Sequence, residues 1–348
     1  MTSTERALKA LPLVILSIAG CSAVAVRLGI RTRLDTVPVA SASVSLFSTN
    51  GKSALTALAP GQTANLVVDV LTQDRRHLKS VGAEAGTVLF DSFTITPSLI
   101  TVDKHGRVAM PEDPRISEHK SARLNLSVVG QPGVTANLDI PLRYDIAYVA
   151  NYSGRNGSDG INGSSGADGH SGSNGPAGDF DPKTGIHGSQ GAGGSGSDGS
   201  RGGDGTNGGE GSAGGDVHVA MRMTEDTIPL LQVRAQSGTR EHLYLIDPTG
   251  GSLKILADGG PGGRGGHGGS GGHGGSGGMG FPLGSIGQNG GTGSDGRPGQ
   301  GGRPGKIFVT VDPGANLYID HLSFQNRDGN GRAGPPPQIV TAPVAALW

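Results

Sequence analysis

The chain has 348 residues, among them 65 glycines and 21 prolines, and its 28 basic and 29 acidic side chains leave a net charge of −1. This balance supplies no field to attract a polyanion, so nucleic acid is not an expected partner. Aromatic residues make up only 4% of the chain, which limits any hydrophobic core to mainly aliphatic side chains. The single cysteine, Cys21, excludes a disulfide within the chain.

The amino terminus carries an apolar stretch that ends at this cysteine. Residues 11–20 follow a weakly basic start and finish with Ile18, Ala19 and Gly20 directly before Cys21, an arrangement typical of an export signal. These four residues resemble the lipobox of bacterial lipoproteins. The resemblance implies that residues 1–20 are a signal peptide and that Cys21 becomes amino-terminal and carries acyl chains such as palmitate. A membrane-spanning helix over residues 11–26 is the alternative, although it is shorter than the roughly 20 residues that span a bilayer.

The lipobox resemblance also implies a location. Several acyl chains give a stable anchor where one chain would not, so the protein is expected in the cell envelope, lipid-anchored to the outer membrane, on its periplasmic or its surface face. Expected partners are this membrane and envelope polysaccharide or other surface proteins. Residues 21–36 carry no pattern and are predicted to be a tether.

Residues 37–150 are predicted to form an antiparallel β-sandwich. Apolar and polar residues alternate here as in half-buried strands, for example where Ala42, Val44 and Leu46 lie between serines. The longest alternation is expected to be one strand, whose inner face would hold Ala136, Leu138, Ile140, Leu142, Tyr144, Ile146 and Tyr148. About 110 residues can hold a core of their own.

A second, smaller β unit is predicted from residues 216–257 and 306–325. Alternating runs begin at Val217, Leu231, Leu243, Leu253 and Ile307, and a last run contains Leu317, Ile319 and Leu322. These runs directly flank the glycine-rich parts of the chain, so we expect the strands to hold the ends of those parts. Residues 326–348 are predicted to be an extended, proline-rich tail, and almost no α-helix is expected outside the signal peptide.

Two tracts, residues 151–215 and 258–305, place glycine at every third position. The first keeps this spacing from Gly154 to Gly178 and resumes it from Gly185, with one slip at Gly193-Gly194. The second keeps it from Gly260 to Gly305, with Phe281 as the exception. A three-residue period fits the polyproline-II type of helix and neither an α-helix nor a β-strand. Interruptions at residues 179–184 and 281–283 are predicted to be chain reversals.

Three structures share this spacing: a bundle of polyglycine-II helices from one chain, a collagen-like triple helix, and a disordered repeat. Proline is scarcer in these tracts than is typical of collagen. A second glycine column from Gly259 to Gly280 favours the bundle, because two bare faces let neighbouring backbones approach and exchange hydrogen bonds. The glycines expected to pack the bundle are Gly260, Gly263, Gly266, Gly269, Gly272, Gly275 and Gly278.

In these tracts the chain resembles polyglycine-II proteins, such as small arthropod antifreeze proteins and the tip adhesins of some phages, and collagen-like proteins of bacterial surfaces. The order of lipobox, sandwich and glycine tracts resembles lipoproteins of predatory or social Gram-negative bacteria, which implies no particular function. The predicted fold class is mainly β: an antiparallel β-sandwich, followed by a second small β unit with inserted polyglycine-II helices.

The remaining column of the second tract is the candidate ligand face. It contains Arg264, His267, Ser270, His273 and Ser276, and its candidate ligands are a glycan or ice. No metal site is expected, because His267 and His273 are two turns apart on such a helix, about 19 Å. Asp198 and Asp204 leave calcium as a weak alternative, since they resemble ligands of calcium-binding repeats.

No catalytic set of side chains stands in a suitable context, so the chain is not expected to be an enzyme and no cofactor is expected. The predicted function is that of an exported, lipid-anchored cell-envelope protein with a structural or adhesive role, presented by the polyglycine-II bundle. The alternatives are a glycan- or ice-binding module on the decorated face and a collagen-like trimeric surface protein.

Overall fold

The computed structural model describes residues 32–81 and 85–348. Cys21 and the lipobox residues Ile18, Ala19 and Gly20 lie outside the described residues. The chain divides into two compact units between Ile146 and Ala147, and Trp348 groups with the first unit. Within the described residues, no helix is both long enough and apolar enough to cross a membrane.

The first unit contains two antiparallel sheets with one hydrophobic core. Its larger sheet has the order β2-β1-β3-β4-β5, with β8 also paired to β3 and β7 paired to β8, and its smaller sheet has the order β10-β9-β6. The strands are β1 Val39–Ser48, β2 Ala54–Leu55, β3 Thr63–Thr72, β4 His77–Val81, β5 Ala85–Gly86, β6 Phe93–Ser98, β7 Thr101–Val102, β8 Arg107–Ala109, β9 Ala122–Val128 and β10 Gln131–Ile140. Three short helices complete the unit: η1 Leu34–Thr36, η2 Phe90–Ser92 and α2 Pro114–Ser117.

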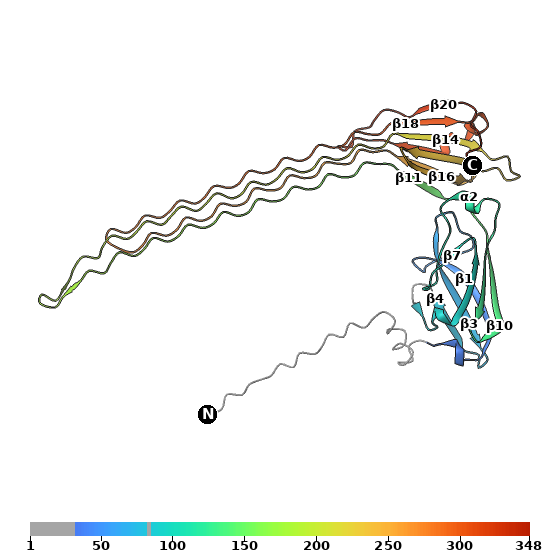
Figure 1. Cartoon of the computed structure of the whole chain (residues 1–348), viewed down its shortest axis with the longest axis horizontal. Helices are drawn as coiled ribbons and strands as arrows, with labels where there is room; N and C mark the ends of the chain where they lie inside the picture. The colour runs from blue at the N-terminus through green and yellow to red at the C-terminus, as the bar shows by residue number, and fades with distance from the viewer. Residues whose placement is uncertain (1–31, 82–84) are drawn as a thin grey trace. The chain divides into compact units, whose positions relative to one another are not determined.

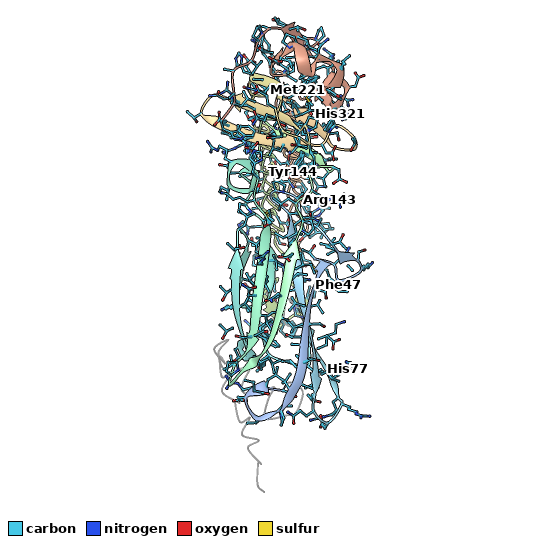
Figure 2. The ribbon with its side chains drawn as sticks, turned by 90° about the vertical axis from the view of Figure 1, so that its right-hand side faces the viewer. Phe47, His77, Arg143, Tyr144, Met221 and His321 are labelled. Atoms are coloured by element: carbon cyan, nitrogen blue, oxygen red, sulfur yellow. The ribbon has the colours of Figure 1, made fainter. Side chains whose placement is uncertain are left out.

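Alternation along these strands produces the core of the first unit. Leu66 and Val68 of β3 and Leu124 and Leu126 of β9 are all buried in one cluster. Phe47, labelled in Figure 2, lies on β1, where it is paired with Ala54 of β2. The prediction of a mainly β fold with antiparallel sheets and almost no helix is confirmed.

The run from Ala136 to Tyr148, predicted as a single strand, is not one strand. It breaks at Pro141, where β10 has ended, and its last two residues belong to the second unit. Proline has no N–H to donate to a ladder, and here its carbonyl accepts instead from the Leu58 N–H at 3.0 Å. The Arg143 N–H donates to the Leu58 carbonyl at 3.1 Å, so the chain leaves β9 for a different partner.

The second unit contains a parallel three-stranded sheet, β11-β17-β19, and a mixed five-stranded sheet, β16-β15-β14-β18-β20. The elements are β11 Ala147–Asn151, β12 Phe180–Asp181, β13 Ile186–His187, β14 Val217–Met223, β15 Leu231–Ser237, β16 Arg240–Ile246, β17 Ser252–Leu256, β18 Ile307–Val311, η3 Pro313–His321, β19 Leu322–Gln325 and β20 Gln338–Thr341. Both sheets contribute to one core, in which Met221, labelled in Figure 2, is fully buried.

One part of the second unit differs from the predicted strands. Residues 313–321, which include Leu317 and Ile319, form the 3-10 helix η3 instead of a strand. Pro313 occupies the first turn, and the Asp312 side chain accepts from the Gly314 N–H, which together favour a helix start. Leu317 is consequently 87% exposed. Within residues 326–348, predicted to be an extended tail, β20 pairs with β18 in parallel.

Candidate functional site

Four glycine segments extend from the sheets of the second unit and lie side by side (Figure 1). We define them as the first (residues 153–178), second (188–215), third (258–280) and fourth (284–305) glycine segments. Apart from bends at its end, this part of the chain carries no helix or strand assignment. The interruptions at 179–184 and 281–283 are where the chain reverses, and β12 and β13 form a hairpin at the first of them.

The first and third segments run parallel and are joined by a ladder of main-chain hydrogen bonds. Every third N–H of the first segment, from Gly154 to Gly175, donates to a carbonyl of the third segment, from Asp258 to Met279, at 2.7–2.8 Å. The bonds therefore recur with the glycine period itself. A helix with three residues per turn has no internal hydrogen bonds, so its groups must be satisfied in this way by neighbours.

The second segment runs antiparallel to both of these and contacts them. Every third N–H of the second segment, from Gly191 to Ser212, donates to a carbonyl of the first segment at 2.7–2.9 Å. The third segment donates to the second, for example from Gly269 N–H to Gly203 O at 2.8 Å. The fourth segment donates to the third at 2.7–3.0 Å and accepts from the second at 2.8–3.0 Å. The second and third segments thus each have three neighbours, whereas the first and fourth have two.

The two glycine columns of the third segment face two of its three neighbours. In the third segment, the seven glycines predicted to pack the bundle are all buried. A Cβ on any of them would lie 1.9–2.1 Å from a main-chain carbonyl oxygen of the first segment. Its second column faces the fourth segment, where a Cβ on Gly268 would lie 2.2 Å from Gly293 O. The first segment has fewer neighbours and needs only one such column.

The sheets and the glycine segments have the same register. In the parallel pair β11 and β17, Ala147 is opposite Ser252, a separation of 105 residues, and the same separation joins Asp159 to Arg264 within the glycine segments. In the pair β14 and β18, Val217 is opposite Ile307. That separation of 90 residues recurs where Asp198 meets Gln288. The strands therefore fix which residues of the glycine segments meet.

A column of aspartate and asparagine side chains forms a second ladder, which we call the Asx ladder. Asn162 Oδ1 accepts from the His267 main-chain N–H at 2.9 Å, and Asp168 Oδ1 accepts from the His273 N–H at 2.7 Å. The further members are Asp159 with Arg264, Asn174 with Met279, Asp198 with Gln288, Asp204 with Ser294, Asn207 with Arg297 and Asp216 with Lys306. These side-chain oxygens accept from N–H groups that take no part in the main-chain ladder.

Between the first and second segments, the position of each serine or threonine depends on the residue that faces it in the other segment. Ser197, Ser200 and Thr206 of the second segment accept through their hydroxyl oxygens from N–H groups of the first at 2.6–2.8 Å. At Gly194, Gly203 and Gly209 the second segment has a glycine in this column and the first segment has the serine, whereas Gly191 faces Pro176. Gly203 is an example, since a Cβ there would lie 3.0 Å from Ser164 Oγ. Hydroxyl side chains from the first segment and from the second segment thus share the space between the two segments.

The candidate ligand column lies on the exposed side of the third segment. Arg264, His267, Ser270, His273 and Ser276 are all exposed. Ser270 and Ser276 bond through their hydroxyls to Ser165 and Ser171, at 3.2 and 3.0 Å. On the other side of the column, His267 Nδ1 lies 3.8 Å from Asp295 Oδ1. The column is therefore polar and is flanked by hydroxyl and carboxylate groups.

One carboxylate of the Asx ladder, that of Asp204, has a pKa shifted by its contacts. The Ser294 N–H, aided by the Arg201 guanidinium, lowers the pKa of Asp204. Arg201 lies 2.8 Å from Asp204 Oδ1 and also donates to the Thr292 carbonyl at 3.2 Å. In the structure, the two aspartates considered as calcium ligands, Asp198 and Asp204, thus accept main-chain N–H groups.

At the base of the first segment, Tyr152 connects the glycine segments to the core. Its ring is buried, and its hydroxyl donates to the Ala235 carbonyl at 2.6 Å. Burial raises the pKa of this hydroxyl to about 12. Its main-chain N–H donates to Leu256 O, and its carbonyl accepts from Gly215 N–H. Tyr152 thus links β15 in the core to the end of β17, which leads into the third segment, and to the end of the second segment.

Sequence reasoning overlooked the Asx ladder and the apolar residues at the end of the bundle. The ladder leaves a readable signal, since Asn156, Asp159 and Asn162 recur with the period of the glycines. The terminal apolar residues stand out because Phe180, Phe281 and Leu283 interrupt tracts of small and polar residues. Comparison of the chain with protein-family models, curated proteins and solved structures gives no significant match, so no family is assigned to it.

Proposed function

We propose that this chain is an exported, lipid-anchored cell-envelope protein, and that its four glycine segments are polyglycine-II helices bundled into a stiff rod with a structural or adhesive role. The observation that carries the proposal is the hydrogen-bond ladder that links all four segments at every third residue. At about 3.1 Å per residue, the first segment would extend about 80 Å. Such a rod would hold its end well away from the sheets that bear it.

The mutual hydrogen bonding of the segments favours an intrachain bundle over the collagen-like trimer. Each segment finds its partners within the same chain, whereas a triple helix would take them from two further copies. The ladder also offsets the conformational entropy lost by ordering glycine, roughly 1–2 kcal/mol per residue. We therefore propose a non-enzymatic role that depends on the stiffness and length of the bundle.

Export and anchoring are supported by the lipobox resemblance at Ile18 to Cys21. The test is metabolic labelling with radioactive palmitate in a Gram-negative host, followed by membrane fractionation, of the wild type and of Cys21→Ala. We expect label and outer-membrane recovery for the wild type only. A wild-type protein without label would refute the anchor and leave the bundle unaffected.

Glycan binding on the candidate ligand column is the second candidate. It is favoured by five exposed polar side chains in one row, of which Arg264, His267 and His273 have their main-chain N–H groups satisfied by the Asx ladder. A glycan array probed with the Cys21→Ala protein tests this candidate. We expect any binding to be lost in Arg264→Ala with His267→Ala and kept in Arg297→Ala, which changes an arginine of the fourth segment.

A further inference from the structure

Exposed apolar side chains gather at the far end of the glycine segments. We define the tip as residues 179–188, which include the hairpin β12 and β13, together with residues 279–286, where the third segment turns into the fourth. Its exposed apolar residues are Phe180 (54% exposed), Ile186 (66%), Met279 (69%), Phe281 (79%), Leu283 (74%) and Ile286 (76%). In Figure 1 the hairpin lies at the end of the bundle opposite the sheets.

This distribution contrasts with the rest of the bundle. Along the glycine segments short of the tip, Ile161 is the one exposed large apolar side chain among the described residues. Single exposed apolar residues are common on protein surfaces, whereas a cluster of exposed apolar side chains marks an interaction site. From this we infer that the tip docks on a lipid bilayer and inserts its apolar side chains into the interfacial region.

The size of the tip argues against a protein partner. Stable protein interfaces use roughly 20–30 residues on each side, more than the whole tip provides. A second copy of the tip would offer an equally small surface. A bilayer needs no matching shape, because apolar side chains enter the boundary between headgroups and acyl chains by about 5–10 Å.

In an apolar environment polar groups must be satisfied internally, and several polar groups of the tip are satisfied in this way. The Phe281 N–H donates to Gly191 O at 3.0 Å, and the Gly193 N–H donates to Pro282 O at 3.0 Å. In the hairpin, Asp181 accepts from the Lys183 N–H at 2.9 Å and from the Thr184 hydroxyl at 2.8 Å. Insertion of the apolar side chains would therefore leave these donors paired.

The charges of the tip indicate which kind of lipid bilayer it binds. Asp179 and Asp181 outnumber the one cation, Lys183, so the tip has no basic patch to attract anionic lipid. The inferred attraction is therefore apolar, and neutral phosphatidylcholine is sufficient. This inference rests on the proposed rod, because only a formed bundle presents these side chains at its end.

A fluorescent label on the tip tests the inference in the full chain. In the Cys21→Ala background, which removes the sole cysteine and the anchor, Lys183→Cys carries an environment-sensitive fluorophore at the tip. Ile161→Cys carries it on the first glycine segment, away from the tip, as the matched control. With phosphatidylcholine vesicles, the fluorescence of the tip label should rise several-fold and be quenched by brominated lipid. The fluorescence of the label at position 161 should not change. Adding phosphatidylglycerol should not raise the binding.

Substitutions then identify the side chains responsible. The triple variant Phe180→Ser, Phe281→Ser and Leu283→Ser should bind vesicles at least about tenfold more weakly. Each substitution removes apolar surface that would be buried in the bilayer. Ile228→Ser with Leu317→Ser, at positions that are 74% and 87% exposed outside the tip, should leave the binding unchanged. Hydrogen exchange on the same samples reports whether the bundle is formed.

Three outcomes would overturn the inference. The first is a tip label that ignores vesicles while the glycine segments are protected from exchange, which leaves the proposed rod standing. The second is a tip label that changes with protein concentration in the absence of lipid, which would mean that a second copy covers the tip. The third is vesicle binding that survives the triple substitution. Rapid exchange throughout the segments would instead refute the rod itself.

Discussion

The main-chain N–H of His267 donates to the side-chain oxygen of Asn162 at 2.9 Å, although the two residues are 105 positions apart. The same separation relates β11 to β17, so the contact in the bundle follows from strand pairing at its base. The sheets of the second unit thus select which residues of the glycine segments meet.

Truncation within the Asx ladder should cost stability only where there is an N–H to satisfy. We expect Asn162→Ala to lower the free energy of unfolding by about 1 kcal/mol, because it leaves the His267 N–H without its acceptor. Asn156→Ala is the matched control. It removes the same side chain from the same column, but the residue in register is Pro261, which has no N–H. Urea titration of both variants measures the difference, and equal losses would mean that the ladder contributes nothing.

A methyl group on a buried glycine should not be accommodated. A Cβ on Gly269 would lie 1.9 Å from Ser164 O, so we expect Gly269→Ala to lower the free energy of unfolding by about 3 kcal/mol or more. Gly291 has no atom within 4 Å of the corresponding position. Gly291→Ala should therefore be neutral or stabilising by up to about 1 kcal/mol. Thermal unfolding of the two proteins provides the comparison, and similar melting temperatures would contradict the close packing.

Because the segments are paired in a fixed register, a change in the length of one segment requires the same change in the others. Deleting one period from all four segments at the same level, residues 163–165, 202–204, 268–270 and 292–294, should leave the ladder one period shorter and otherwise intact. Deleting residues 163–165 alone should displace every later contact of the first segment relative to the second. We expect slow amide exchange in the fourfold deletion and loss of protection beyond the cut in the single deletion. If the single deletion were tolerated equally well, the segments would have no fixed register.

Acid should weaken the contact between the second and fourth segments. The pKa of Asp204 is lowered by the Ser294 N–H and the Arg201 guanidinium, so the folded state favours the carboxylate. A carboxyl group whose pKa is lower in the folded state stabilises the protein above its unfolded pKa of about 3.9, and this contribution is lost as the pH falls through the folded value. We expect a drop in melting temperature between pH 4 and pH 2.5 that is smaller in Asp204→Asn. An equal drop in both would assign the effect to other groups.

Much of the architecture could be predicted because it depends on local pattern. The two-residue alternation around Leu124 and Leu126 identifies strands of the first unit, and the three-residue period locates the glycine segments and their reversals. The number of glycine columns also distinguishes the third segment, which has three neighbours, from the first, which has two. These features concern one segment at a time.

What could not be predicted depends on the pairing of distant segments. The acceptor role of Asn162 needs the separation of 105 residues, which no local pattern gives. The alternation of Ser164 and Gly203 across two segments has the same cause. The prediction of a strand at Leu317 is wrong for a local reason, since Pro313 and Asp312 start a helix that overrides the apolar alternation. The strand at residues 338–341 is stabilised by β18 rather than by its own sequence.

Amide hydrogen exchange resolved by residue tests the central claim most directly, namely that the glycine segments lie against one another as one bundle. We predict slow exchange for glycine N–H groups at every third position, such as Gly163, which donates to His267 O at 2.7 Å, and Gly269, which donates to Gly203 O at 2.8 Å. Exchange at the rate of an unfolded chain throughout residues 154–178 and 259–305 would contradict the bundle and every role assigned to it.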